Sequence, residues 1–258
     1  MHVDLPVNAF KHRLLAGEQQ IGLWSHLSSH VSTEVIAGSG FDWVLIDAEH
    51  SPNDVLAVLP QLLACVGGTA SPIVRVPWND TVLIKRYLDI GAQSLLIPYV
   101  QNAAEARAAV EAMRYPPRGV RGFAGATRAS RFGRVPDYHT RAEEELCLLV
   151  QVETAEALTN LEAIANTDGV DGVFIGPGDL AASMGHLGQP GHPEMQTIVV
   201  DTIKRIRACG KPAGILTADE KLARMFMEAG TTFTAVGADI GILARGTEQL
   251  AARYKGAL

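Results

Sequence analysis

A chain of 258 residues that is 47% hydrophobic and 19% charged suits one α/β domain, residues 1–258, with a large buried core. Its formal charge of −6 argues against a general nucleic-acid binder, because phosphate contacts need a net or clustered basic surface. We also expect neither a secretion signal nor a membrane span, since no apolar run approaches the roughly 18 to 20 residues that cross a bilayer, and therefore a cytoplasmic protein.

Short apolar runs alternate with longer amphipathic stretches along the whole chain, which predicts βα units and a parallel sheet covered by helices. The predicted strands are 20–26, 41–48, 72–77, 93–99, 145–153, 169–176, 211–217 and 231–238. The predicted helices between and after them are 30–39, 53–65, 80–90, 102–113, 154–165, 179–184, 194–209, 219–229 and 240–254. Eight such units favour a closed (β/α)₈ TIM barrel over an open doubly wound sheet, with an extra N-terminal helix at 7–16 that closes its bottom.

One segment departs from this regular pattern. The segment from Arg114 to Thr140 is long and rich in glycine and arginine, and loops of this length in compact domains are usually functional or disordered. Its arginines have no helical spacing, so they are expected either to bind a carboxylate of an acidic substrate or, the safer interpretation, to contact another subunit.

The three cysteines show no CxxC spacing and are predicted to be reduced core thiols.

Polar residues that follow barrel strands are the best candidates for chemistry, because catalytic groups of these barrels gather at the carboxyl ends of the strands. This criterion selects His50, Arg75, Gln151, Glu153 and Asp179.

Glu153 and Asp179 follow two consecutive strands, with no cysteine nearby and no histidine at a zinc-like spacing. Two such carboxylates fit a hard or borderline divalent ion, namely magnesium, manganese or cobalt. The ion would keep positions open for water and a bidentate substrate and would polarise a carbonyl. The alternative is that each carboxylate caps the helix that follows it.

The string GPGD places Gly176 and Gly178 in a tight turn before a helix, where backbone N–H groups favour a small anion. The same glycines could serve only to turn the chain.

His50 and Arg75 have plausible roles in a reaction. His50 lies in a loop at a strand end, where an imidazole could take a proton, and Asp47, Glu49 or Asp89 could raise its basicity. Arg75 is the only charge in its strand and could stabilise a developing enolate oxygen in the mouth. A structural salt bridge is the alternative for Arg75, and plain strand-end or helix-end positions are the alternatives for Asp47 and Asp89.

Six strings in order carry a resemblance to class II pyruvate aldolases of the HpcH/HpaI family, typified by 4-hydroxy-2-oxoheptanedioate aldolase. They are LIDAEHSPND, IVRVPWND, YLDIGAQSLLIPYV, YPPRGVRGF, LVQVET and FIGPGDLAASMG. Each string alone is a modest signal, but together they span nearly the whole chain and are specific.

The resemblance implies that Glu153 and Asp179 bind a divalent metal that chelates pyruvate, with Gln151, Gly178 and Asp179 contacting the pyruvate. It implies that Arg75 stabilises the enolate and that His50 is the base. Asp89 is the acid expected to raise the basicity of His50, with Asp47 as the second choice.

The reaction that follows is cleavage of a 4-hydroxy-2-oxo acid to pyruvate and an aldehyde such as succinic semialdehyde, through a metal-bound pyruvate enolate. The resemblance also implies a homo-oligomer, a hexamer built as a trimer of dimers, with sites near subunit contacts.

Three rival functions stay open. The first is a sugar-acid aldolase of the same family, acting on 2-dehydro-3-deoxyglucarate or 2-keto-3-deoxyrhamnonate. The second is an acyl-CoA lyase, which would need a basic nucleotide-binding surface. The third is a non-catalytic barrel that binds an acidic metabolite.

Overall fold

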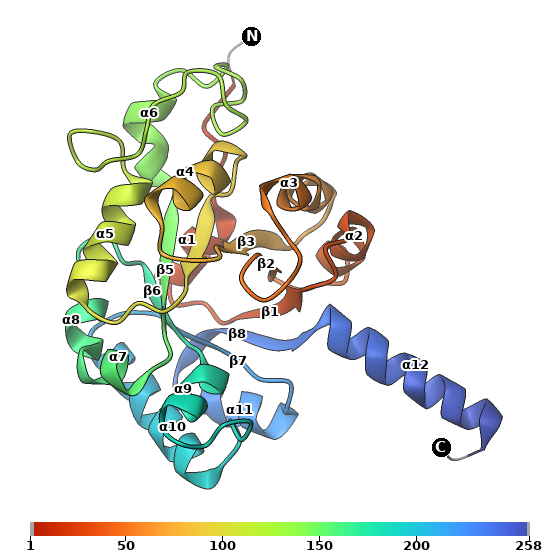
Figure 1. Cartoon of the computed structure of the whole chain (residues 1–258). Helices are drawn as coiled ribbons and strands as arrows, with labels where there is room; N and C mark the ends of the chain where they lie inside the picture. Colours follow the sequence, from red (N-terminus) through yellow and green to blue (C-terminus); the bar gives the residue numbers. More distant parts are fainter. Residues whose placement is uncertain (1–2, 257–258) are drawn as a thin grey trace.

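All eight predicted strands are present in the computed structural model, which describes residues 3–256, and they close into one parallel barrel in sequence order (Figure 1). The strands are β1 (Gln20–Ser25), β2 (Trp43–Asp47), β3 (Ser71–Arg75), β4 (Ser94–Ile97), β5 (Cys147–Val152), β6 (Gly172–Ile175), β7 (Ala213–Leu216) and β8 (Thr231–Ala238). Every residue of β2, β4, β5 and β6 is buried, as expected for parallel strands covered on both faces. The predicted TIM barrel is therefore confirmed.

Helices cover the outside of the barrel, mostly where they were predicted. They are α1 (Ala9–Leu15), α2 (His30–Ala37), α3 (Val55–Ala64), α4 (Thr81–Asp89), α5 (Ala103–Met113), α6 (Tyr138–Arg141), α7 (Ala155–Thr159), α8 (Leu161–Ala165), α9 (Pro177–Ser183), α10 (Pro193–Ala208), α11 (Glu220–Ala229) and α12 (Asp239–Lys255), with short 3₁₀ turns η1 (Cys65–Gly67) and η2 (Ala142–Glu144). The helix predicted over 154–165 is two helices that meet at Asn160, and the predicted loop contains α6. Within residues 3–256, none of these helices combines the length and apolarity that crossing a membrane requires.

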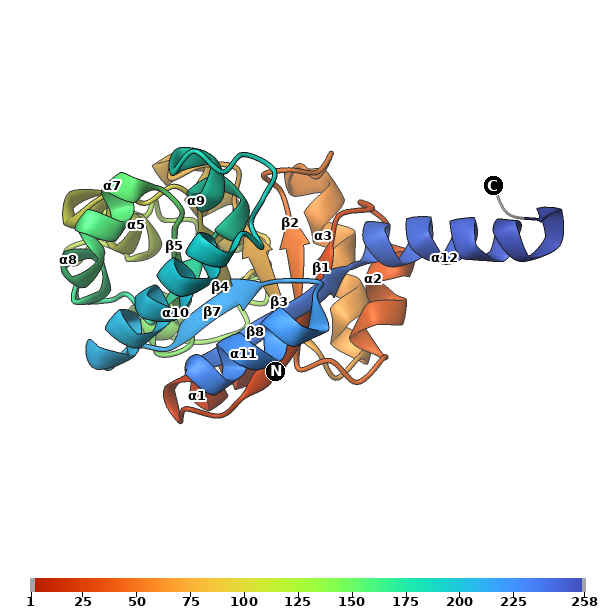
Figure 2. The same cartoon turned by 90° about the horizontal axis from the view of Figure 1, so that it is seen from below.

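The lower half of the barrel interior is filled by aromatic side chains under the extra N-terminal helix. Phe10 of α1 is fully buried and packs against Trp43 and Phe233 at ring-centroid distances of 6.1 and 6.0 Å. Only glycine fits at Gly22, where a Cβ atom would lie 2.2 Å from the Trp43 ring. In Figure 2, α1 lies below the barrel while α7 and α9 lie at the opposite end, so α1 closes the bottom and the strands point toward an open mouth.

The last helix behaves differently from the others. Only Asp239, at its start, is buried in α12, where its carboxylate accepts hydrogen bonds from the backbone of His26 and Leu27. Beyond that anchor, α12 extends away from the barrel (Figures 1 and 2). Its exposed apolar side chains are Ile240, Ile242, Leu243, Leu250 and Tyr254.

Candidate active site

The register of β2 and β3 brings an acid and an arginine together at the mouth. Asp47 and Arg75 are paired residues at the ends of these two strands. Arg75 donates from Nε and Nη2 to the two carboxylate oxygens of Asp47 at 2.8 and 2.7 Å, and its Nη1 lies 2.9 Å from Oε2 of Glu49. The salt-bridge interpretation of Arg75 is therefore correct, but its two hydrogen bonds to Asp47 leave three of its five N–H groups available.

The two carboxylates beside Arg75, those of Asp47 and Glu49, both lie deep in the mouth, but their pKa values shift in opposite directions. Burial would raise the pKa of the Asp47 carboxyl, but hydrogen bonds from His26 and Arg75 outweigh it and hold that pKa well below its usual range. His26 Nε2 lies 3.1 Å from Asp47 Oδ2. Burial raises the pKa of Glu49, against the opposing charge of Arg75. Asp47 therefore stays ionised as the fixed partner of Arg75, whereas Glu49 carries charge that Arg75 only partly balances.

Glu153 follows β5 and is almost fully buried, at 1% exposure. Its Oε1 accepts the backbone N–H of Tyr99 at 2.8 Å, and its Oε2 accepts Nε2 of Gln151 at 2.6 Å. Gly176, next to it after β6, must be glycine, since a Cβ there would lie 2.3 Å from Glu153 Oε2. The other amide atom of Gln151, Oε1, is buried without a hydrogen-bond partner in the described chain, so it faces this site as an unused acceptor.

Asp179 lies in the first turn of α9, across the mouth from Arg75. Its Oδ1 accepts a hydrogen bond from the hydroxyl of Tyr99 at 2.8 Å. The capping alternative fails for both acids, because α7 is capped by Thr154 and the N-cap of α9 is Gly176 with no side-chain bond. A Cβ at Gly178 would meet nothing within 4 Å, so the turn before Asp179 opens onto free space.

Tyr99 links the two acids and was absent from the residues selected by sequence. It has a left-handed backbone, with φ of 52°, which turns its N–H toward Glu153 while its hydroxyl reaches Asp179. The exposed ring of Trp78 stacks on it at 5.7 Å. The signal that could have found Tyr99 is its position at the end of a predicted strand. A tyrosine hydroxyl at such a position can take part in the chemistry as a carboxyl group can.

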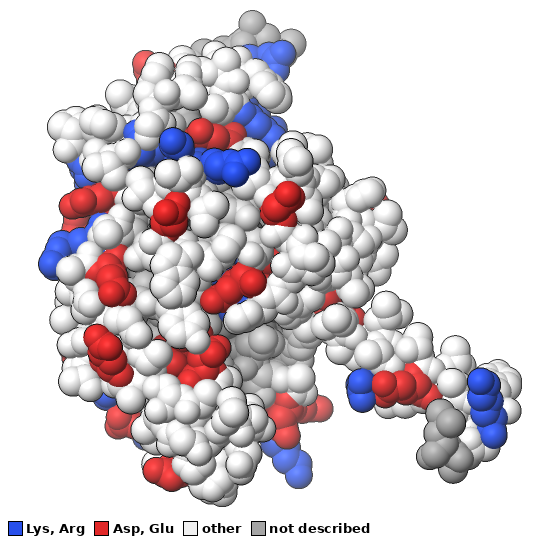
Figure 3. All heavy atoms as spheres, viewed as in Figure 1, with Lys and Arg blue, Asp and Glu red and all other residues white. Residues whose placement is uncertain are grey.

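The electrostatics of the mouth favour a cation. Burial, together with the charges of Glu49 and Asp179, raises the pKa of Glu153 to about 7 against the opposing hydrogen bond from Tyr99 and the charge of Arg75. Glu49, Glu153 and Asp179 therefore share the mouth with one arginine, Arg75, that is already hydrogen-bonded to Asp47. Acidic side chains are also spread over the whole mouth-side face of the barrel, whereas basic ones gather mainly along its edge (Figure 3). Glu153, Asp179 and the orphaned oxygen of Gln151 are the oxygen donors that hard divalent ions prefer, so these residues fit a metal.

His50 lies at the rim of this mouth with 60% of its side chain exposed. The acid nearest to it is Glu49, whose Oε1 is 3.9 Å from His50 Nε2. Glu49 is one of the three acids that the sequence offered as able to raise the basicity of His50.

The predicted pairing of Asp89 with His50 is wrong within one chain. Asp89 is the last residue of α4, and a helix between parallel strands runs back from the mouth, so Asp89 lies at the opposite rim. There its Oδ1 accepts Nη2 of Arg121 at 2.8 Å. The second choice, Asp47, is bonded to Arg75 and His26 instead.

Arg121 also corrects the interpretation of the arginine-bearing loop. Its side chain is fully buried and lies 4.5 Å from the centre of the Tyr115 ring. This arginine holds the loop to its own barrel, so it is not a subunit contact.

A second cluster lies in the loop between α9 and α10. Within residues 3–256 it is the one group of three histidine, cysteine, aspartate or glutamate side chains whose ligand atoms lie within 4.8 Å of one another, namely His186, His192 and Glu194. Nε2 of His186 pairs with Glu194 at 3.0 Å, and Nδ1 of His192 accepts the backbone N–H of Glu194 at 3.3 Å, which caps α10. These bonds explain the cluster as a structural contact that holds the loop against the start of α10.

Comparisons with known proteins show the family to which this chain belongs. A model of the HpcH/HpaI aldolase/citrate lyase family matches residues 20–245. A pyruvate aldolase of Rhizobium etli is 62% identical over 98% of this chain and 99% of its own length. A 4-hydroxy-2-oxo-heptane-1,7-dioate aldolase of Klebsiella pneumoniae is 58% identical over 96% of this chain and 94% of its own. The crystal structure of an HpcH/HpaI aldolase/citrate lyase family protein from Burkholderia cenocepacia superposes with a TM-score of 0.92, at 39% identity over 97% of this chain and all of that one.

Proposed function

The chain belongs to the HpcH/HpaI aldolase/citrate lyase family, and we propose that it is a divalent-metal-dependent aldolase that reversibly cleaves a 4-hydroxy-2-oxo acid to pyruvate and an aldehyde. The observation that carries the proposal is the mouth itself. Glu153 and Asp179 are tied to one tyrosine, the turn at Gly178 beside Asp179 opens onto free space, and Arg75 is already bonded to Asp47 and so does not balance the two acids.

Glu153 and Asp179 would hold the metal, which we propose to be manganese, cobalt or magnesium. When bound, such an ion acts as a Lewis acid on the 2-oxo group of the substrate. Gln151 and the backbone of Gly178 and Asp179 would contact the pyruvate part, where the buried Oε1 of Gln151 still lacks a partner.

Arg75 would stabilise the enolate oxygen that develops when the carbon–carbon bond breaks. Its bidentate bond to Asp47 fixes the guanidinium plane, and its remaining N–H groups are free to bind the substrate. A donor held in place before the reaction needs no reorganisation during it, which is how such groups stabilise charge in a transition state.

His50 would be the base. It takes the proton of the 4-hydroxyl while the C3–C4 bond breaks, so that the aldehyde leaves and the bonding electron pair remains on the pyruvate enolate. Return of a proton to C3 then gives pyruvate. The exposure of His50 at the rim allows an imidazole to meet an incoming hydroxyl group and to exchange its proton with water.

The test is release of pyruvate from 4-hydroxy-2-oxoheptanedioate by the purified protein. We expect EDTA to abolish the activity and manganese, cobalt or magnesium to restore it. Undiminished activity after removal of metal would contradict the metal assignment, and no pyruvate from any 4-hydroxy-2-oxo acid would contradict the function.

The aldehyde is the open half of the substrate. We propose that the aldehyde is succinic semialdehyde. It is the product expected from 4-hydroxy-2-oxoheptanedioate, the substrate for which the Klebsiella relative is named. The alternatives are the aldehydes released from 2-dehydro-3-deoxyglucarate or 2-keto-3-deoxyrhamnonate. A screen of these aldehydes with pyruvate and manganese, following which aldol forms fastest, separates them.

We also propose that the protein is a homo-oligomer, a hexamer. The support is the exposed apolar side of α12, which leaves the barrel without packing on it, and such contiguous apolar surface usually marks an interface. In an oligomer, Asp89 could contact the His50 of a second copy and raise its basicity. This is the one arrangement in which Asp89 can have its predicted role.

Complementation tests that arrangement. His50→Ala and Asp89→Asn proteins would each be weakly active. A refolded mixture would regain activity, because some sites would combine the intact His50 of an Asp89→Asn subunit with the intact Asp89 of a His50→Ala subunit. Additive activity in the mixture, or a monomer by light scattering, would contradict it.

A further inference from the structure

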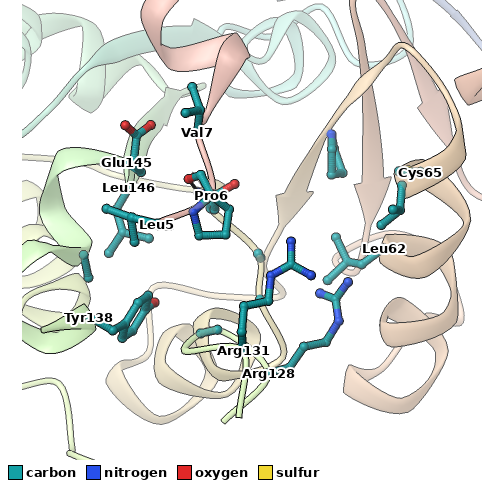
Figure 4. Close-up of a pocket in the computed structure, with 17 residues that line it drawn as sticks. Leu5, Pro6, Val7, Leu62, Cys65, Arg128, Arg131, Tyr138, Glu145 and Leu146 are labelled. Atoms are coloured by element: carbon teal, nitrogen blue, oxygen red, sulfur yellow. Dashed lines mark hydrogen bonds between the residues drawn. The ribbon is translucent and has the colours of Figure 1, made fainter. Parts of the chain in front are cut away.

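A cavity of about 220 Å³ opens at the bottom of the barrel, away from the aldolase mouth. It is bounded by the N-terminal segment, the end of α3, the start of β3, the turn before β4 and the arginine-bearing loop. Figure 4 shows Arg128 and Arg131 of that loop extending their guanidinium groups into the same space, which Leu62 and Cys65 also line. None of its lining residues belongs to the proposed aldolase site.

Arg128 is held in place by the barrel. Its Nη1 donates to the carbonyl of Ile90 at 2.8 Å. The neighbouring Gly91 has a φ of +97°, and a Cβ there would lie 2.5 Å from the same nitrogen, so the guanidinium packs directly on the glycine backbone. One bond to a carbonyl leaves four of the five N–H groups of Arg128 for another acceptor.

Arg131 is presented by an unusual turn. Arg131 and Phe132 both have left-handed backbones, with φ of 52° and 60°. The turn is closed by backbone bonds from Arg131 to Arg128 and from Phe132 to Thr127, at 2.9 and 2.8 Å. Non-glycine residues rarely keep this conformation unless the surrounding structure imposes it, and such positions cluster at ligand-binding sites.

No carboxylate balances these two arginines within residues 3–256. The acid that lines the cavity, Glu145, is turned toward the N-terminal segment, where its carboxylate accepts the backbone N–H of Asn8 at 2.6 Å and pairs with His12 at 3.0 Å. Burial and the nearby charge of Arg131 lower the pKa of Arg128. Two like charges thus converge on a partly enclosed space, which an anion would relieve.

Much of the rest of the lining is apolar, although Gln93, Tyr138 and Glu145 also contribute to it. The apolar residues include Leu5, Pro6, Leu62, Val66 and Pro72, and Figure 4 shows Leu62 beside the guanidinium group of Arg128. An ion without an apolar part would leave this surface uncovered, whereas a carboxylate with a short aliphatic chain would use both halves.

We propose that this cavity binds a small organic carboxylate, whose head lies between Arg128 and Arg131 and whose aliphatic chain packs against Leu62 and Val66. The guanidinium plane matches a carboxylate in a bidentate manner, and the small volume limits the chain to a few carbons. The site is separate from the aldolase mouth and does not depend on the proposed reaction.

The test uses hexanoate as the probe and isothermal titration calorimetry on the intact protein. We expect saturable binding to the wild-type protein and at least about tenfold weaker binding to Arg131→Gln, because a charge-assisted hydrogen bond is lost. Arg131 is exposed, so its variant should fold, which thermal melting checks. Arg134→Gln is the matched control, since Arg134 belongs to the same loop but not to the cavity lining.

Several outcomes would overturn the proposal. They are equal hexanoate affinity in Arg131→Gln and the wild type, equal losses in Arg131→Gln and Arg134→Gln, and 1-hexanol binding as tightly as hexanoate. Inorganic phosphate, tested in parallel, should bind more weakly than hexanoate. Tighter phosphate binding would also overturn it, because the apolar walls would then play no part.

Discussion

The two ends of the barrel carry opposite, unbalanced charges. At the mouth, Glu49, Glu153 and Asp179 surround Arg75, which already has Asp47 as a partner. At the bottom, Arg128 and Arg131 enter a cavity whose acid is engaged elsewhere. The net charge of −6 reports neither condition. Unpaired charge that is partly buried is costly, so each imbalance points to what binds there: a cation at the mouth and an anion at the bottom.

The strongest test of the mouth is Glu153→Gln. The amide keeps the shape but removes a charged ligand, so we expect manganese binding and aldol cleavage to be lost together, measured by calorimetry and pyruvate release. Glu156→Gln, an exposed residue of α7, is the matched control and should behave like the wild type. Metal binding that survives in Glu153→Gln would remove this residue from the metal site.

A smaller loss is expected from His50→Ala. Removal of a general base slows proton transfer by roughly 10² to 10⁴-fold, while manganese binding should stay unchanged because His50 is not a ligand. His30→Ala, an exposed histidine of α2, serves as the control. Near-normal cleavage by His50→Ala would mean that another group takes the hydroxyl proton.

The raised pKa of Glu153 makes a prediction for the metal-free protein. Its pKa is about 7 in the folded protein, against an ordinary value of 4.5 for a glutamate, so the folded state holds the proton more tightly. Stability should therefore fall as pH rises from about 4.5 to 7, by up to about 3 kcal/mol from this group. Glu153→Gln lacks the group, so its free energy of unfolding should exceed that of the wild type at pH 8 but not at pH 4. An equal difference at both pH values would contradict the cause.

The smallest expected effect is that of Tyr99→Phe. This change removes the hydroxyl bond to Asp179 but keeps the backbone bond to Glu153. Loss of a group that orients a ligand typically weakens metal binding by roughly 10- to 100-fold, and we expect the lower end because one of two bonds remains. Manganese titration followed by EPR measures it, with the exposed Tyr254→Phe as control. Unchanged affinity would show that Tyr99 does not position the metal ligands.

Much of the mouth could be predicted because strand ends can be read from apolar runs. Arg75, Gln151, Glu153 and Asp179 each follow or end a strand, and parallel strands carry such residues to one rim. Tyr99 was missed because its role depends on backbone conformation and on distances across the mouth. Glu49 was named only as a neighbour of His50, and its contact with Arg75 was not foreseen. Asp89 was misplaced within the chain because a resemblance assigned the role without saying which rim, or which copy, supplies the residue.

The sequence by itself determined the barrel, its N-terminal cover and the set of polar residues at the mouth, since these follow from local periodicity and from the fixed direction of parallel strands. Only the tertiary structure decided which groups touch. It paired Arg75 with Asp47 through strand register, joined both proposed metal ligands to Tyr99 and sent Asp89 to Arg121. It also left Arg128 and Arg131 without an acidic partner among the described residues 3–256. Such pairings depend on side-chain positions that residues far apart in the chain set jointly, and no local pattern encodes them.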